Sequence, residues 1–165
     1  MKRKYLILLS LSGFILALDQ LTKNLVYLNL EPGTVRSYLG GLVTLERTFN
    51  AGFAFGLVQR TPDSLRDVVF LGLPVFALVL IVLVFIKLQD DQMLTSIALT
   101  TLLAGAMGNL IDRAQYGHVV DFLNLHFGAV SLPAFNVADV SIALGVVLMV
   151  VGMVRGGWRG VHGKA

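Results

Sequence analysis

Four segments of this chain are long and apolar enough to cross a membrane as helices, and they constrain its fold more than any other feature. They cover residues 5–22, 68–86, 93–111 and 137–154. A helix needs about 20 apolar residues to span the roughly 30 Å hydrocarbon core of a bilayer. The middle two segments contain no charged residue, and the first and last contain one aspartate each. The sequence therefore predicts an all-α polytopic membrane protein with four transmembrane helices, built as a single domain over residues 1–165.

The composition agrees with a membrane protein and excludes several functional classes. Hydrophobic residues make up 56% of the chain and charged residues 14%, and the mean hydropathy is +0.78, well above that of an ordinary soluble domain. The absence of cysteine excludes disulfides, thiol nucleophiles and Cys-ligated zinc. The basic residues are scattered rather than gathered on one face, so nothing favours a nucleic-acid partner.

The distribution of basic residues predicts the orientation of the spans. Lysines and arginines flank both ends of the chain: Lys2, Arg3, Lys4, Arg155, Arg159 and Lys164. None occurs between residues 114 and 136. By the positive-inside rule both termini face the cytoplasm, although four arginines in the 24–67 loop weaken the bias. A basic start before an apolar run also occurs in cleavable signal peptides, but no small-residue cleavage site follows, and we expect the first helix to be retained.

The connections between spans predict a small β-structure and one tight turn. Residues 34–50 alternate in side-chain type around the Gly40-Gly41 dipeptide, which predicts a β-hairpin or cradle outside the bilayer, between the first two helices. The glycines and phenylalanines of residues 50–56 suit a loop that dips into the interface. Residues 87–92 form a short turn that makes the second and third spans antiparallel neighbours.

Two aspartates, Asp121 and Asp139, are the strongest candidates for chemistry. They lie at either end of the short loop between the third and fourth spans, which places both at the outer interface. A carboxylate near hydrocarbon is costly unless it is paired, protonated or wetted. Two carboxyl groups held close together share one proton, and one pKa rises. Such a pair activates water and protonates a leaving amine in aspartic proteases, without a metal or cofactor.

Structural roles compete with this interpretation. Asn136 suits a helix N-cap, and Asp139, three residues later, is well placed against the helix dipole. Asp121 taken alone could be a solvated loop acid. Asp19 and Lys23 are four residues apart, so we expect them to form an ion pair at the end of the first span.

Further polar residues gather near the outer ends of the spans. Asn50, Asn109 and Asn136 need hydrogen-bond partners if they are buried, and three amides at one depth could also bind a peptide backbone. Arg113 is favoured at a helix C-terminus by the dipole, and it could orient a substrate carbonyl or a carboxylate. The small residues at positions 104–106 and 108 would let helix ends approach closely around these side chains.

A zinc site and a serine-histidine-acid triad are two other possibilities, but the spacing and setting of the residues fit neither. His118 and His126 flank Asp121, yet their spacing matches no zinc motif, so we expect no bound metal. A triad of Ser131, His126 and an acid lacks the strand-to-helix setting of a nucleophile elbow.

Five motifs, in order along nearly the whole chain, resemble those of the lipoprotein signal peptidases, also called signal peptidase II. They are Asp19-Gln20-Leu21-Thr22-Lys23, Asn50-Ala51-Gly52-Phe53-Ala54-Phe55, Gly105-Ala106-Met107-Gly108-Asn109-Leu110-Ile111-Asp112-Arg113, Gly117-His118-Val119-Val120-Asp121-Phe122 and Phe135-Asn136-Val137-Ala138-Asp139. Phe53 stands where the family usually has alanine, and Ala104 stands where the third motif usually begins with glycine. These departures concern local packing rather than the chemistry.

The resemblance implies a bacterial inner-membrane aspartyl endopeptidase that removes the signal peptide from diacylglyceryl-modified prolipoproteins. It implies that Asp121 and Asp139 are the catalytic dyad, at the outer face of the membrane. Residues 34–55 would form the family's extracytoplasmic β-cradle. The implied partners are the prolipoprotein and membrane lipid, with no cofactor, and a monomer is the default. Other matching positions would shape the site or position the substrate: Asp19, Lys23, Asn50, Gly52, Asn109, Arg113 and Asn136.

Two other functions remain possible from the residues alone. A small transporter or proton-coupled channel could use Asp19, Asp121 and Asp139 as a relay, but such proteins usually place acids near the bilayer centre rather than at one interface. A structural assembly subunit would tolerate asparagine in place of either Asp121 or Asp139. Neither alternative explains the five motifs.

Overall fold

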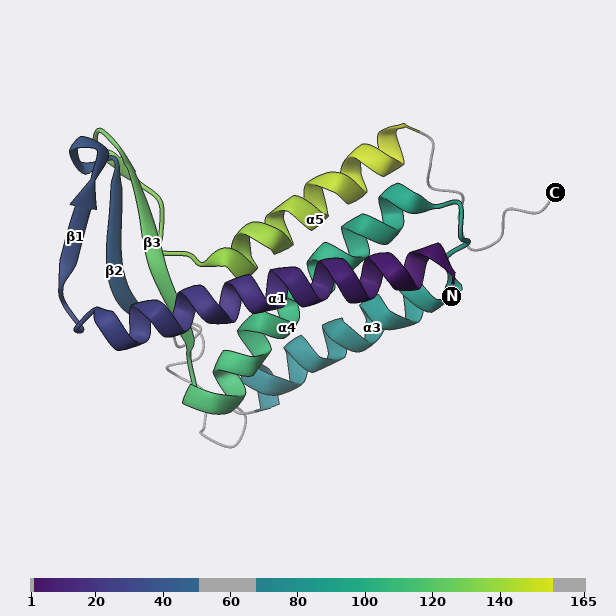
Figure 1. Cartoon of the computed structure of the whole chain (residues 1–165), viewed down its shortest axis with the longest axis horizontal. Helices are drawn as coiled ribbons and strands as arrows, with labels where there is room; N and C mark the ends of the chain where they lie inside the picture. Colours follow the sequence, from purple (N-terminus) through teal and green to yellow (C-terminus); the bar gives the residue numbers. More distant parts are fainter. Residues whose placement is uncertain (1, 51–67, 156–165) are drawn as a thin grey trace.

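The computed structural model describes residues 2–50 and 68–155, and it has four long helices with a small sheet at one end (Figure 1). The helices are α1 (Arg3–Asn29), α3 (Leu73–Lys87), α4 (Met93–Tyr116) and α5 (Val137–Val154). A short π-helical segment, η4 (Val68–Gly72), leads into α3. All four helical segments are long and apolar enough to cross a membrane, counting η4 with α3. The predicted set of four spans is therefore confirmed.

Helices α1 and α4 extend beyond the apolar segments that predicted them. Helix α1 continues to Asn29 rather than ending near residue 22, and α4 continues to Tyr116 rather than residue 111. Helix α4 ends at Gly117, whose φ of 71° is left-handed and whose amide donates to the Arg113 carbonyl at 3.0 Å. Hydropathy marks only the part of a helix that faces lipid. The polar turns at the sheet end of these helices therefore carry Lys23 and Arg113 on rigid helix instead of loop.

Helix α4 packs against each of the other three helices, and glycines determine how closely α1 and α5 approach it. A Cβ atom on Gly105 would overlap the Ala138 carbonyl of α5, and one on Gly108 would overlap the Asp19 carboxylate of α1. On the α5 side, a Cβ on Gly145 would lie 2.6 Å from Leu102 Cγ. The predicted role of small residues in close helix packing is confirmed at Gly105 and Gly108, and Gly145 is a further close contact that was not predicted.

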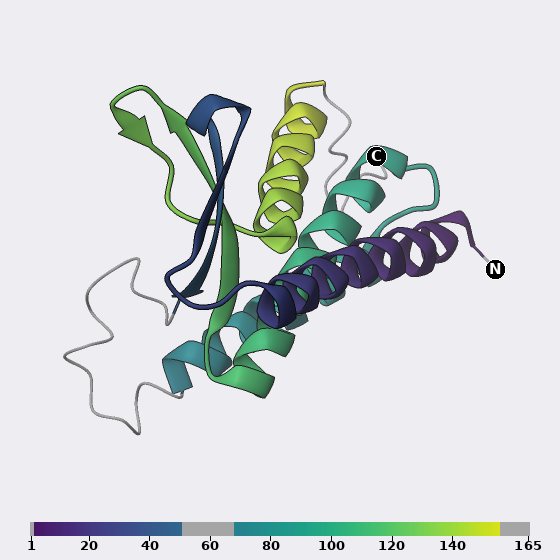
Figure 2. The same ribbon diagram turned by 60° about the vertical axis from the view of Figure 1, so that its left-hand side comes forward.

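The sheet has four antiparallel strands in the order β1-β2-β3-β4. Strands β1 (Val35–Tyr38) and β2 (Val43–Asn50) are joined by the turn η1 (Leu39–Gly41), which confirms the predicted hairpin. Strands β3 (Val119–Phe127) and β4 (Val130–Ser131) follow α4 and precede α5 in the sequence. Figure 2 shows β3 running from the end of α4 along β2. The prediction of a short loop between the third and fourth spans was wrong, because this connection supplies two of the four strands.

Candidate active site

Asp121 lies in β3, and amides from two other parts of the chain hold its carboxylate. Asn50 Nδ2, at the end of β2, donates to Asp121 Oδ2 at 2.8 Å. Asn136 Nδ2 donates to Asp121 Oδ1 at 2.7 Å. Asp121 is only 2% exposed. It is therefore a buried strand residue and not a solvated loop acid.

A β-bulge in β2 places Asn50 on the same face of the sheet as Asp121. Leu45 pairs with Leu123, but Thr48 pairs with Asp121, so β2 contains one more residue than β3 between these two pairs. Side chains alternate between faces along a strand, so one extra residue reverses the face of every residue after it. Without the bulge Asn50 would point away from Asp121. With the bulge it reaches the carboxylate as a diagonal neighbour across the two strands.

Asp139 lies in the first turn of α5 and forms a capping box with Asn136. The Asp139 amide donates to Asn136 Oδ1 at 2.9 Å, and the Asn136 amide donates to Asp139 Oδ2 at 3.2 Å. The predicted N-cap is confirmed, and the two bonds satisfy amides that the helix leaves unpaired. Asp139 Oδ1 accepts from Asn109 Nδ2 at 2.8 Å. The half-buried Asp139 carboxylate thus stabilises the helix and also belongs to a polar network.

Asn136 joins the two aspartates into one site. Its side-chain amide donates to Asp121 and its backbone amide donates to Asp139, so both carboxyl groups lie within hydrogen-bond distance of one residue. Asn109 of α4 donates to Asp139 and accepts from Asn136 Nδ2 at 3.1 Å. The three asparagines that the sequence placed at one depth therefore surround the carboxyl pair.

Burial raises the pKa of Asp121 from its usual 3.8 to about 6. The hydrogen bonds from Asn50 and Asn136 and the positive charge of Lys23 oppose this rise, whereas the negative charge of Asp139 adds to it. A carboxyl group with a pKa near 6 is partly protonated close to neutral pH. The pair can therefore hold one proton in the range where an acid and a base are both needed.

Two buried acids behind the site hold the backbone immediately before each aspartate. Asp112 Oδ2 of α4 accepts from the Val120 amide at 3.1 Å, and Val120 precedes Asp121. Asp19 Oδ1 of α1 accepts from the Ala138 amide at 2.8 Å, and Ala138 precedes Asp139. The positions of both candidate catalytic residues thus depend on carboxylates from other helices.

Lys23 connects these two supporting acids. Its Nζ lies 2.8 Å from Asp19 Oδ2 and 2.9 Å from Asp112 Oδ2, and it donates to Asn109 Oδ1 at 3.0 Å. All three charged side chains are at most 3% exposed. The predicted Asp19–Lys23 ion pair is confirmed, and it is one part of a larger cluster that fixes the separation of β3 and α5.

The sequence interpretation missed the roles of Asp112 and Gln20. Gln20 Nε2 donates to Asp112 Oδ1 at 3.0 Å, which satisfies the carboxylate oxygen that Lys23 does not contact. Asp112 follows Asn109 by three residues, and residues with this spacing share one face of a helix. That spacing was the available signal for Asp112. Gln20 has no comparable pattern in the sequence.

Arg113 is placed by its own helix and by an aromatic ring. Its Nη1 donates to the Asn109 carbonyl at 3.1 Å, and its guanidinium lies 5.0 Å from the centroid of the Phe70 ring. Within residues 2–50 and 68–155 it makes no hydrogen bond to Asp121 or Asp139, so its predicted role in orienting a carboxylate or substrate stays a prediction. Gly52, Phe53 and the rest of the predicted interfacial loop after Asn50 lie outside the described residues.

The two histidines near Asp121 have separate surroundings. The ring of His118 meets that of Phe49 edge to face, with centroids 4.5 Å apart. His126 Nδ1 lies 2.7 Å from Ser131 Oγ, but its Nε2 faces Thr44 Oγ1 at 2.9 Å. The Ser131–His126 contact therefore exists without the acid that a triad needs. The part of the chain that the structure describes contains no group of three His, Cys, Asp or Glu placed to hold a metal ion.

Known proteins resemble this chain over most of its length. The signal peptidase (SPase) II family matches residues 11–155. The lipoprotein signal peptidase of Syntrophus aciditrophicus is 36% identical to it over 94% of this chain and 96% of that protein. That of Geobacter sulfurreducens is 40% identical over 85% of this chain and 86% of the relative.

Two solved structures, each described as a bacterial membrane enzyme, have the same fold. One superposes with a TM-score of 0.77 at 30% identity and covers 91% of both chains. The other has a TM-score of 0.78 at 26% identity, and covers 98% of this chain and 93% of that one. The arrangement of four helices and a terminal sheet is thus shared with membrane enzymes.

Proposed function

This chain belongs to the signal peptidase II family, and we propose that it is an aspartyl endopeptidase that cleaves the signal peptide from diacylglyceryl-modified prolipoproteins. Its catalytic residues are Asp121 and Asp139, and the reaction needs no metal or cofactor. One observation carries this proposal. Asn136 hydrogen-bonds both carboxyl groups, and the pKa of one of them is raised to about 6.

Proton transfer within the pair accounts for both halves of the reaction. The ionised carboxylate takes a proton from water while the water oxygen attacks the scissile carbonyl carbon. The protonated carboxyl donates its proton to the carbonyl oxygen, which gives a tetrahedral diol. When the carbon–nitrogen bond breaks, the newly protonated carboxyl donates to the leaving amine, and a diol hydroxyl returns its proton to the other carboxylate. The pair ends the cycle with one shared proton, as it began.

The surrounding residues have positioning roles in this proposal. Asn50, Asn109 and Asn136 fix the two carboxyl groups, and the Asp19–Lys23–Asp112 cluster fixes the backbone that carries them. Gly52 and Arg113 shape the site or position the substrate. Both termini face the cytoplasm, the site opens at the outer face of a bacterial inner membrane, and a single chain is sufficient. There it meets a substrate whose signal helix and acyl chains remain in the bilayer.

The decisive experiment measures cleavage of a diacylated prolipoprotein peptide and of its unlipidated form by purified protein in detergent. Asp121→Asn and Asp139→Asn should each lower turnover of the diacylated peptide by about 10³-fold or more, because each removes the acid–base function. Glu31→Gln, which alters an exposed acid beyond the end of α1, is the matched control and should keep full activity. A chelator should leave the wild type unaffected.

Each part of the proposal has its own contrary result. Retained turnover in either aspartate variant would remove the dyad. Strong inhibition by the chelator would point to metal-dependent hydrolysis. Equal cleavage of lipidated and unlipidated peptides would leave the peptidase in place but remove the requirement for the diacylglyceryl group.

A further inference from the structure

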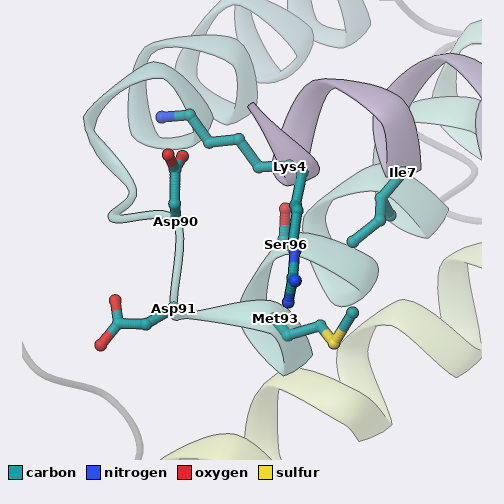
Figure 3. A pocket seen from close by; sticks show the side chains of 7 residues that line it. Lys4, Ile7, Asp90, Asp91, Met93 and Ser96 are labelled. Atoms are coloured by element: carbon teal, nitrogen blue, oxygen red, sulfur yellow. The ribbon is translucent and has the colours of Figure 1, made fainter. Parts of the chain in front are cut away.

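A second polar site lies at the end of the helices opposite the sheet. It is a cavity of about 100 Å³ between the start of α1, the α3–α4 turn and the start of α4 (Figure 3). Helix α1 has 27 residues and is therefore about 40 Å long, so the cavity is roughly a bilayer thickness away from the sheet. The cavity is lined by Arg3, Lys4, Ile7, Asp90, Asp91, Met93 and Ser96.

Ser96 contributes a buried hydroxyl without a partner to this cavity. The residue is 1% exposed, and among the described residues its Oγ makes no hydrogen bond. Several other helical hydroxyls donate to the carbonyl one turn back, as those of Ser10, Thr22 and Thr101 do, although the buried hydroxyl of Thr100 does not. An unsatisfied buried hydroxyl is costly. The hydroxyl of Ser96 therefore has an unused hydrogen-bonding capacity at the wall of the cavity.

One side of the cavity is positive and suits a phosphate. Helix α4 begins at Met93 without a side-chain cap hydrogen bond, so the positive end of its dipole lies at the cavity. Arg3 adds an exposed guanidinium. Lys4 is 4% exposed and donates to the carbonyls of Ile86 at 2.9 Å and Leu88 at 2.6 Å. One N–H of its ammonium group remains for another acceptor.

Negative charge lies on the other side. Asp90 and Asp91 are exposed, and across the described ranges neither forms an ion pair within 4.0 Å. Figure 3 shows the Asp90 carboxylate pointing toward the ammonium end of Lys4, whereas the Asp91 carboxylate points away from the cavity. These carboxylates would repel a simple anion. A group that carries both a phosphate and an ammonium would match both sides.

We propose that this cavity binds the phosphoethanolamine headgroup of a membrane phospholipid. The phosphate lies against Ser96, Arg3 and the start of α4, and the ammonium lies against Asp90, whose carboxylate is on the cavity side. Ile7 and Met93 line the cavity with apolar side chains, and Met93 is 52% exposed, which gives the acyl chains a route toward the bilayer. The bound lipid belongs to the leaflet on the side of the N-terminus. It is therefore a different molecule from the lipid of the proposed substrate.

The test compares three phospholipids with identical acyl chains bound to the full chain in detergent, by native mass spectrometry. Phosphatidylethanolamine should bind about fivefold more tightly than phosphatidylcholine, because a quaternary ammonium donates no hydrogen bond to a carboxylate. Phosphatidylglycerol, which lacks the positive charge, should also bind more weakly. The double variant Asp90→Asn and Asp91→Asn should reduce the preference to less than about twofold. Glu31→Gln, at the other end of α1, should leave it unchanged.

The phosphate side has its own pair of variants. Ser96→Ala and Arg3→Gln should weaken all three lipids by about threefold to tenfold, because the lipids share the phosphate. Lys87→Gln, an exposed cation at the end of α3 that does not line the cavity, should have no effect.

Three outcomes would overturn the proposal. Equal binding of all three lipids by the wild type would mean that no headgroup is recognised. A preference for phosphatidylethanolamine that survives in the double aspartate variant would place the binding elsewhere. Equally tight binding of soluble phosphoethanolamine would make the cavity a site for a water-soluble ligand instead of a lipid.

Discussion

Replacing Asp121 with asparagine should change stability in opposite directions at acid and alkaline pH. The pKa of Asp121 is about 6 in the folded protein against 3.8 for a free side chain, so the folded state binds this proton more tightly than the unfolded state. The wild type therefore loses stability from this group as the pH rises from about 4 through 6, and the full cost is present above that range. A shift of about two pKa units corresponds to about 3 kcal/mol.

The variant removes this cost and introduces a smaller one. Asparagine carries no charge, so the penalty for burying a carboxylate at high pH disappears. Asp121 accepts from both Asn50 and Asn136, and a side-chain amide has only one acceptor oxygen, so one of these bonds is lost at a cost of about 1 kcal/mol. Compared with the wild type, we expect Asp121→Asn to be more stable by about 2 kcal/mol at pH 8 and less stable by about 1 kcal/mol at pH 4.

Reversible unfolding in detergent at a series of pH values between 4 and 8 would measure this crossover. Glu31→Gln serves as the control, since it removes an exposed carboxyl group whose loss should leave the pH profile of the wild type unchanged. A constant stability difference between Asp121→Asn and the wild type at all pH values would refute the inference that burial of Asp121 raises its pKa.

Three further predictions concern the packing, the sheet and the ion cluster. Gly108→Ala should destabilise the protein by about 1 to 3 kcal/mol, because the new methyl overlaps the Asp19 carboxylate. Gly13→Ala, at a glycine with open space around it, should not destabilise the protein. Equal effects of the two variants in unfolding experiments would contradict this prediction. Deleting Glu46 from the bulge should turn the Asn50 side chain to the other face of the sheet and lower kcat about 10- to 100-fold. Glu46→Ala keeps the bulge and should keep activity. An active deletion variant would show that the bulge is unnecessary. Lys23→Met should lower the free energy of unfolding by about 3 to 5 kcal/mol, because it leaves two buried carboxylates without their cation. A decrease of less than about 1 kcal/mol would disprove the stabilising role of the cluster.

Hydropathy predicted the four spans because lipid demands long apolar helices, but it could not locate their ends. Lys23 and Arg113 are polar and look like loop residues, yet both lie in helices that continue beyond their apolar segments. Strand β3 had a usable signal, since Leu123, Leu125 and Phe127 alternate with polar residues. The bulge in β2 had none, because it depends on how two strands far apart in sequence pair.

The candidate site was predictable to the extent that its residues act locally. The Asn136 cap follows from the spacing of Asn136 and Asp139 within one helix start, and the Asp19–Lys23 pair follows from a spacing of four. The contact between Asp112 and the Val120 amide depends on how β3 folds back beside α4, and the contact between Asp19 and the Ala138 amide joins the first helix to the last. Such long-range contacts leave no periodic trace in the sequence.

The ion pair within α1 has a consequence for the order in which the protein is made. Helix α1 leaves the ribosome before α4 and α5, when neither Asp112 nor the Ala138 amide has yet been synthesised. Until then Asp19 and Lys23 form an ion pair within the same helix, with their charged atoms 2.8 Å apart. The nascent span therefore enters the bilayer without an unpaired charge at these two positions. Asp19 receives the Ala138 amide only when the last helix arrives. A chain halted before its fourth span would lack Asp139, so under the proposed function it would be inserted in the membrane without peptidase activity.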